Sequence, residues 1–222
     1  MAKLIVIEGT DASGKQTQSE LLYEYFKKEN TNVVRLCFPD YESPSSSLVK
    51  MYLNGDFGKT PDAVDGKIAS IFYAADRYAS YQTKWEALSK EKNAVIIFDR
   101  YVTSNMIHQA AKVKDAAEKD AFLDWVYDLE YGILGLPQPD HIIFLNMPPE
   151  QAEILMKNRV NKITNEAQKD IHESDKEYLK TCYNNACYVA KKYNWTVISC
   201  VIDGNLRSIE EIQEEIRKCV CS

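Results

Sequence analysis

The chain is poor in the residues that build metal centres. Its three histidines lie far apart among 222 residues, and none of its six cysteines forms a C-x-x-C pair. A structural zinc site is therefore not expected. The cysteines fall in predicted strands, in a predicted helix and at the C-terminal end, and we interpret them as free thiols of a cytoplasmic protein rather than as disulfides.

Long apolar runs and basic blocks are also missing. No run approaches the roughly 20 apolar residues that a membrane-spanning helix needs. The first predicted strand begins almost at once, so we expect no signal peptide. The net charge is −6, so general nucleic-acid binding is not expected. A content of 45% hydrophobic and 27% charged residues is typical of a soluble globular protein, and we expect one domain over residues 1–222.

Short apolar runs alternate with helical patterns along the chain. We predict strands at Leu4–Glu8, Val33–Cys37, Val95–Phe98, His141–Leu145 and Val197–Ile202. These runs are rich in Val and Ile, as strands covered on both faces should be. The last helical pattern opens with a capping box, Ser208 and Glu211. The alternation predicts a three-layer α/β/α fold with a five-stranded, mainly parallel sheet.

A glycine-rich turn follows the first predicted strand. It consists of Gly9, Thr10, Asp11, Ala12, Ser13, Gly14 and Lys15. The two glycines permit backbone conformations in which successive N–H groups point at one anion. Lys15 adds a positive charge, and the helix predicted after it presents the positive end of its dipole. Strand, turn and helix in this order predict a phosphate-binding loop.

The residue after the lysine departs from the usual pattern. Gln16 stands where a Ser or Thr that helps to hold Mg²⁺ is common, and Thr17 comes one position later. Gln16 could offer its amide oxygen or act through water, and the sequence does not decide between the two.

The third predicted strand is followed by Asp99-Arg100-Tyr101. Ligands bind beyond the carboxyl ends of the strands in open parallel sheets. Asp99 is therefore a candidate for binding Mg²⁺ or its waters, and Arg100 is a candidate for binding a phosphate. The alternative interpretation is a structural ion pair between Asp99 and Arg100.

A basic segment follows the fourth predicted strand. Residues 157–170 contain four cations and few apolar anchors, between helical patterns at Pro149–Asn158 and Glu173–Asn194; the cations are Lys157, Arg159, Lys162 and Lys169. Two interpretations stay open: a solvated loop, or a short lid that closes over phosphates.

The order and spacing of further segments resemble the thymidylate kinases, the nucleoside monophosphate kinases that phosphorylate dTMP with ATP. The resemblance runs end to end. Besides the phosphate loop it rests on Phe38-Pro39, Tyr73-Ala74-Ala75-Asp76-Arg77, Asp99-Arg100-Tyr101, Ser104-Asn105, Pro149-Glu150, Asp170-Ile171-His172-Glu173 and Ile202-Asp203-Gly204-Asn205. It implies a P-loop kinase that forms dTDP and ADP for dTTP synthesis, uses Mg²⁺, and assembles as a homodimer through packed helices.

The resemblance also implies roles for residues around the acceptor dTMP. Tyr73 would stack on thymine, where the family usually has Phe, and Arg77 would hydrogen-bond the base. Ser104 and Asn105 would read the polar edge of the base. Asp11 would accept a hydrogen bond from the 3′-hydroxyl and Arg100 would bind the phosphate, beside the apolar corner of Phe38 and Pro39.

For the donor, the resemblance implies that ATP is bound by residues 9–17 and that Asp203 and Asn205 lie against adenine. The family places its catalytic cation either in the phosphate loop or in the lid. Since Ala12 and Ser13 supply no cation, the resemblance assigns this role to Arg159 or Lys162. Lys15 and Arg100 would be further catalytic cations around the transferred phosphoryl group.

Two further positions depart from the family. Asp40 and Tyr41 follow the Phe38-Pro39 corner, where an arginine that grips the acceptor phosphate is common. His108 takes a position often held by an aromatic residue that screens out ribose 2′-hydroxyls, so discrimination against ribonucleotides could be altered.

Two other functions use the same loop. A deoxynucleoside kinase phosphorylates a 5′-hydroxyl and needs a carboxylate base, for which Glu8 is the obvious candidate. A nucleotide-dependent switch would need a partner surface that responds to the γ-phosphate. The sequence favours the monophosphate kinase, because its strand ends supply a second small-molecule pocket.

Overall fold

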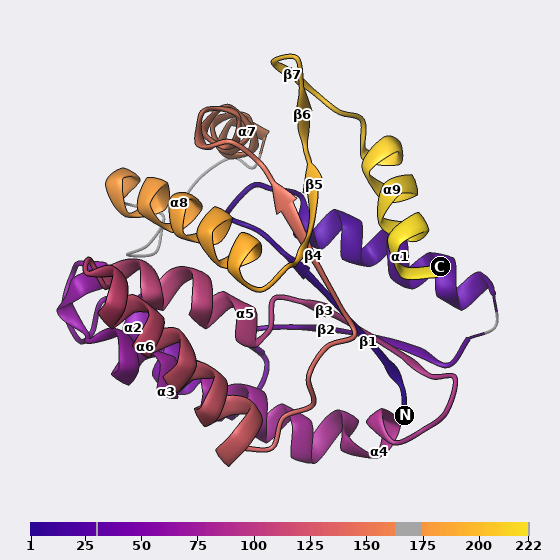
Figure 1. Ribbon diagram of the computed structural model, residues 1–222, viewed down its shortest axis with the longest axis horizontal. Coiled ribbons are helices and arrows are strands. Elements are labelled where there is room, and N and C mark those ends of the chain that lie inside the picture. The colour runs from indigo at the N-terminus through magenta and orange to yellow at the C-terminus, as the bar shows by residue number, and fades with distance from the viewer. Residues whose placement is uncertain (30, 163–174, 222) are drawn as a thin grey trace.

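The predicted five-stranded sheet is confirmed. The computed structural model describes residues 1–29, 31–162 and 175–221, with residues 157–162 described by their backbone alone. All strands are parallel, in the order β2-β3-β1-β4-β5 (Figure 1). Their bounds are β1 Lys3–Glu8, β2 Val33–Cys37, β3 Val95–Asp99, β4 His141–Asn146 and β5 Thr196–Ser199.

Alternate residues of the central strands enter two different cores. In β1, Leu4 and Val6 pack on one face of the sheet, and Ile5 and Ile7 pack on the other. The strands β3 and β4 divide in the same way. Because side chains alternate across a strand, a sheet that is apolar at every position needs helices on both faces.

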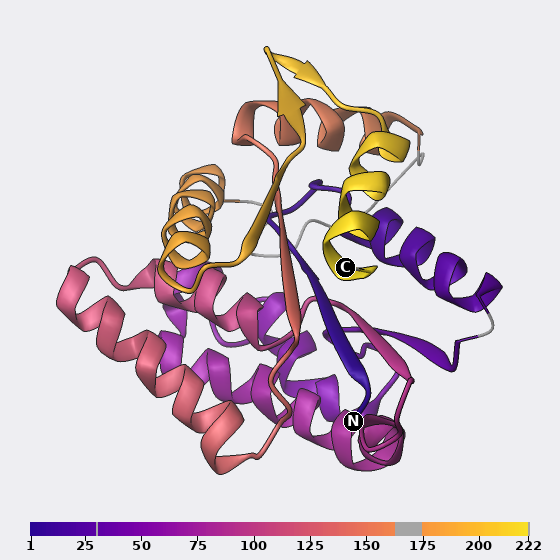
Figure 2. The same cartoon turned by 45° about the vertical axis from the view of Figure 1, so that its right-hand side comes forward.

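The helices supply this cover. One face carries α1 (Lys15–Lys28) and α9 (Ile209–Cys221). The other face carries α2 (Ser47–Leu53), α3 (Gly66–Ser80), α4 (Glu86–Ser89), α5 (Val102–Ser104), α6 (Ala116–Tyr127) and α8 (Lys176–Lys192). Figure 2 shows α7 (Pro149–Lys162) across the carboxyl end of the sheet. The three-layer α/β/α fold is thus confirmed.

One predicted strand differs in the structure. The segment Val197–Ile202, predicted as one strand, ends its pairing with β4 at Ser199 and continues as β6 (Val201–Ile202), which pairs antiparallel with β7 (Asn205–Leu206). Asp203 and Gly204 both have positive φ and form the two-residue turn that reverses the chain. The helical segment from Gly66 to Ser89 is divided into α3, a π-helical turn at Tyr81–Trp85, and α4.

The helix before the predicted lid is longer than expected. We predicted its end at Asn158, and α7 continues to Lys162. Arg159 and Lys162 therefore belong to the last turns of this helix, and their side chains lie outside the described part of the structure. Residues 163–170 of the predicted lid lie outside it as well.

Smaller features match the sequence. The capping box is present, because the Ser208 amide donates to Glu211 Oε2 at 2.9 Å and the Glu211 amide donates to Ser208 Oγ at 3.2 Å. None of the six cysteines forms a disulfide in the structure. Of the helices described, none is both long and apolar enough to span a bilayer.

A substitution of Phe98 in β3 tests the core on the face of the sheet that also contains Leu4 and Val6. Its buried ring stacks on Tyr101 with centroids 4.4 Å apart and meets Trp85 edge-on at 5.1 Å. We expect Phe98→Ala to lower the free energy of unfolding by about 3–5 kcal/mol, because it removes these contacts and leaves a cavity. Urea denaturation measures this. The control is Ile133→Ala at a position 71% exposed, which should change stability by less than about 1 kcal/mol; equal effects would contradict the assigned core.

Candidate active site

The predicted phosphate loop connects β1 to α1. At Gly9 a Cβ would lie 2.5 Å from Ser13 Oγ and 3.0 Å from the Leu145 carbonyl oxygen, so no side chain fits there. Gly14 has a φ of 87° and is the N-cap of α1. Because Gly14 provides no side-chain cap, the first amides of α1 remain available to an anion.

Lys15 lies inside this loop. Its buried Nζ donates a hydrogen bond to the Thr10 carbonyl oxygen at 2.6 Å. Burial, followed by the charge of Arg100, lowers the pKa of Lys15 to about 8, although nearby carboxylates oppose the shift. The amine is thus held against the loop where an anionic ligand would restore its full charge.

Glu8 joins the loop to the segment after β3. Its carboxylate is fully buried. Oε1 accepts from the Gly9 amide at 3.0 Å, and Oε2 accepts from the hydroxyls of Thr103 at 2.7 Å and Ser104 at 2.8 Å. The guanidinium of Arg100 lies 3.8 Å away. Because both oxygens are already used as acceptors, this carboxylate is a structural anchor.

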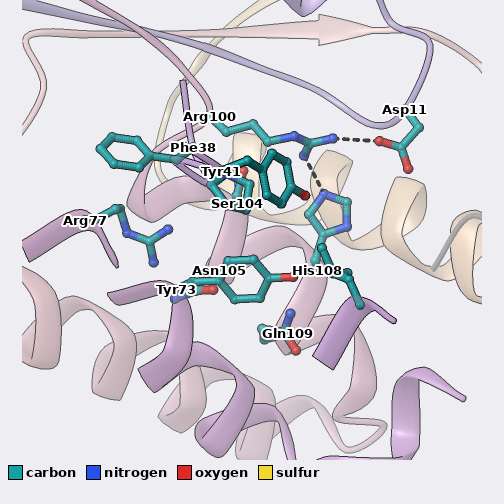
Figure 3. Close-up of a pocket in the computed structure, with 12 residues that line it drawn as sticks. Asp11, Phe38, Tyr41, Tyr73, Arg77, Arg100, Ser104, Asn105, His108 and Gln109 are labelled. Atoms are coloured by element: carbon teal, nitrogen blue, oxygen red, sulfur yellow. Dashed lines mark hydrogen bonds and ion pairs between the residues drawn. The ribbon is translucent and has the colours of Figure 1, made fainter. Parts of the chain in front are cut away.

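Arg100 is held at the centre of the site. Its backbone adopts a φ of 67°, a left-handed conformation that is unusual for a residue with a side chain. Nη2 donates to Asp11 Oδ1 at 2.6 Å, and Nη1 lies 3.0 Å from His108 Nε2 (Figure 3). Burial would lower the pKa of Arg100, but the neighbouring carboxylates, Asp11 first, outweigh burial and raise it.

A pocket opens beside the phosphate loop. Every residue that was predicted for the acceptor lines it, and they are joined by Tyr41, Leu53 and Gln109; the predicted ones are Asp11, Phe38, Pro39, Tyr73, Arg77, Arg100, Ser104, Asn105 and His108. Figure 3 shows Arg100 with Asp11 and His108 on one side of this pocket and Arg77 on the other. The structure thus gathers residues from four separate stretches of sequence into one cavity.

The side of the pocket away from the loop contains a buried ion pair. Arg77 on α3 donates from Nε and Nη2 to the two oxygens of Glu130, each at 2.6 Å. Both side chains are almost fully buried. Burial would lower the pKa of Arg77, but the charge and hydrogen bonds of Glu130 outweigh it and raise the pKa. Asn105 Nδ2 also donates to Glu130 Oε1, at 2.8 Å.

Asp99 closes β3 beside the phosphate loop. Its Oδ2 lies 3.3 Å from Nη2 of Arg35, so the ion pair of Asp99 is with Arg35 on the neighbouring strand, whereas Arg100 pairs with Asp11. Among the residues described, no group of three His, Cys, Asp or Glu side chains could hold a metal. A metal at Asp99 would therefore share its coordination with phosphates and water, which is the usual mode for Mg²⁺.

The departures from the family pattern have clear positions. Asp40 is turned to Lys84, with which it forms an ion pair, while Tyr41 lines the pocket. At the start of α1, Gln16 Nε2 donates to Glu20 at 3.0 Å and Thr17 is exposed. Asp40 is thus not among the residues that line the pocket.

The residues predicted to contact adenine lie in the β6–β7 hairpin. Asp203 and Asn205 are exposed, and Asn205 Nδ2 donates to the Asp203 carbonyl oxygen at 3.2 Å. Cys200, which precedes the hairpin, has its Sγ 4.0 Å from the Ser13 carbonyl oxygen. This contact places the start of the hairpin beside the phosphate loop.

Glu130 is the functional candidate that the sequence reading missed. The buried residues Phe122, Leu123 and Val126 form a helical stripe, and Glu130 is the next position on it, four residues after Val126. A carboxylate in an otherwise apolar stripe signals a buried partner. Its partner Arg77 lies 53 positions away, so local patterning does not reveal the pair.

The parallel fold, the phosphate loop and the adjoining pocket are together typical of the P-loop nucleoside monophosphate kinases. A sequence family described as "Thymidylate kinase" matches residues 7–216. The chain is 34% identical to the thymidylate kinase of Mycobacterium tuberculosis over 175 residues, which cover 78% of this chain and 79% of that protein.

Two other relatives align over most of the chain. The thymidylate kinase of Plasmodium falciparum is 27% identical over 221 residues (97% of this chain, 88% of the relative). The "Probable thymidylate kinase 1" of Saccharolobus solfataricus is 32% identical over 208 residues, with 92% of each chain covered. The chain belongs to the thymidylate kinase family.

The lowered pKa of Lys15 predicts a pH dependence of ATP binding. Lys15 is protonated below pH 8 and loses its charge as the pH rises through about 8. We therefore expect ATP affinity to fall above pH 8, approaching tenfold per pH unit. Isothermal titration from pH 6.5 to 9.5 measures it, and Lys15→Met should bind more weakly without this dependence. An affinity that stays constant to pH 9.5 would contradict the assignment.

Proposed function

We propose that the protein transfers the γ-phosphoryl group of ATP to dTMP and releases dTDP and ADP, with these nucleotides rather than nucleic acid as its partners in the cytoplasm. The observation that carries this proposal is the position of Asp11. It belongs to the phosphate loop and also lines the acceptor pocket, where it binds Arg100 at 2.6 Å. A donor phosphate in the loop and an acceptor phosphate at Arg100 would therefore be neighbours.

The chemistry requires charge neutralisation and alignment rather than a protein nucleophile. Lys15 and the open amides of α1 would bind the donor phosphates. Ser13 Oγ is buried with no hydrogen-bond partner among the described residues, so a phosphate oxygen would satisfy it. Arg100 would release Asp11 and bind the acceptor phosphate instead. Asp11 would then accept a hydrogen bond from the 3′-hydroxyl of dTMP. No general base is needed, because the acceptor phosphate is already an anion.

Mg²⁺ fits this site. Asp99, with Gln16 and Thr17 at the start of α1, offers oxygen ligands, and Arg35 binds one oxygen of Asp99. When bound, the ion would neutralise charge on the phosphates between donor and acceptor.

We also propose that either Arg159 or Lys162 supplies the catalytic cation that Ala12 and Ser13 do not provide. Both lie in the last turns of α7, which crosses the carboxyl end of the sheet (Figure 2). Residues 157–170 would then act as the short lid over the phosphates rather than as a solvated loop.

The alternative functions have less support. A deoxynucleoside kinase would need Glu8 as a base, yet Glu8 is fully buried and its oxygens accept bonds from Gly9, Thr103 and Ser104. A nucleotide switch would have no use for the second pocket. An assay with thymidine in place of dTMP distinguishes the deoxynucleoside kinase from the proposed enzyme. An assay for phosphate transfer to any nucleoside monophosphate distinguishes the nucleotide switch.

The direct test is an ADP-release assay across dTMP, dUMP, dCMP, dAMP, dGMP and thymidine. We expect dTMP to give the highest kcat/KM, and Arg100→Ala to lower kcat/KM for dTMP by about 100-fold or more, because it removes the cation that binds the acceptor phosphate.

The matched control is Lys92→Ala. Lys92 is an exposed cation just before the amino end of β3, whereas Arg100 follows its carboxyl end, so this substitution should leave kcat/KM unchanged. A folded Arg100→Ala protein with near-normal turnover would refute the role of Arg100. A wild-type protein that phosphorylates thymidine and not dTMP would refute the proposed function.

We further propose a homodimer that packs α3 against its copy. Ile68, Ile71 and Tyr78 lie on one face of α3 and remain 48%, 45% and 40% exposed. An apolar stripe of this kind on a surface helix favours self-association. We expect light scattering to give a dimer for the wild type and a monomer for Ile71→Asp. The control Ile154→Asp, on α7 at a position 51% exposed, should stay dimeric; a monomeric wild type would contradict the proposal.

A further inference from the structure

One buried carboxylate binds two of the residues that are expected to hydrogen-bond the base, Arg77 and Asn105. Glu130 is fully buried and accepts from Arg77 Nε and Nη2 at 2.6 Å each. Its Oε1 also accepts from Asn105 Nδ2 at 2.8 Å. Arg77 and Asn105 line the pocket (Figure 3), whereas Glu130 is not among the residues that line it. Glu130 can therefore act on a ligand only through these two side chains.

These contacts determine which way the Asn105 amide points. An amide nitrogen carries two hydrogens. Nδ2 of Asn105 directs them at two acceptors, the Ser70 carbonyl oxygen at 3.1 Å and Glu130 Oε1. The reverse orientation would place the amide oxygen against two other oxygens. Asn105 therefore offers its oxygen, an acceptor, to the pocket.

The same carboxylate orients the donor beside it. Two of the three guanidinium nitrogens of Arg77 are bound to Glu130. The third, Nη1, has no hydrogen bond within the described residues, and Arg77 lines the pocket. Since a guanidinium can only donate, the pocket presents a fixed donor at Arg77 and a fixed acceptor at Asn105.

We propose that Glu130 is a positioning residue that fixes the hydrogen-bond polarity of the base subsite and so restricts the acceptor to keto pyrimidines. Thymine and uracil offer an N3–H donor to Asn105 and the adjacent O4 acceptor to Arg77. Cytosine reverses both groups, with an unprotonated N3 and an amino group at position 4. It would place acceptor against acceptor and donor against donor. This inference rests on the proposed function and deepens it.

The experiment compares dTMP with 5-methyl-dCMP. Both carry the 5-methyl group, so they differ only in the polarity of N3 and position 4. For the wild type we expect kcat/KM to favour dTMP by about 100-fold or more, as in sites that leave buried polar groups unpaired with the wrong substrate. Glu130→Gln replaces one acceptor oxygen with a donor, which frees the Asn105 amide to turn. We expect this preference to fall at least tenfold, mainly through KM.

The control makes the same chemical change nearby. Asp128→Asn converts an exposed carboxylate to an amide in the same π-helical turn, Asp128–Ile133, and should leave the preference unchanged. A folded Glu130→Gln protein with the wild-type preference would overturn the inference while leaving the proposed function intact. A wild type that phosphorylates 5-methyl-dCMP within tenfold of dTMP would do the same. A wild-type protein that phosphorylates no nucleoside monophosphate would refute both the inference and the proposed function.

A second measurement does not depend on the variant being able to fold. Neutron diffraction from the deuterated wild-type protein locates the two deuterons of the Asn105 amide. We expect them on the Ser70 carbonyl oxygen and on Glu130. Deuterons directed into the pocket would overturn the inference.

Discussion

The Glu8 carboxylate is the constraint on which the geometry of the site depends. It ends the central strand β1, so it lies where the phosphate loop leaves the sheet. Its hydrogen bonds to Gly9, Thr103 and Ser104 tie the loop to the segment after β3, and its charge lies 3.8 Å from Arg100. The phosphate loop and the segment that carries Arg100 are thus held in fixed register by one buried anion, which would be unfavourable without all these partners.

The sequence predicts the fold well because its signals are local. Continuous apolar runs rich in Val and Ile predict strands that are covered on both faces. Gly9 and Gly14 mark the phosphate loop. The predicted end of the last strand, at Ile202, is wrong because Asp203 and Gly204 form the turn of a hairpin that the strand pattern does not reveal. Pairing in that hairpin competes with extension of the parallel sheet, and only the turn geometry decides between them.

The site was harder to predict from residue patterns. The spacing of Tyr73 and Arg77 places them on one helix face, but nothing local connects that face to Asn105 or to the phosphate loop; the resemblance to a known family supplied that connection. Asp99 and Arg35 are 64 positions apart, and Arg77 and Glu130 are 53 apart. Such pairs depend on the completed fold, so composition and periodicity do not contain them.

Arg100 combines backbone strain with a central position in the site. Its left-handed backbone is a conformation that glycine adopts without steric cost and arginine does not. A glycine there would relax the chain between β3 and α5 but would also remove the guanidinium. The ion pair of Arg100 with Asp11 at 2.6 Å and the nearby charge of Glu8 at 3.8 Å offset this backbone strain, so the same guanidinium that a phosphate would bind also holds its own loop in place.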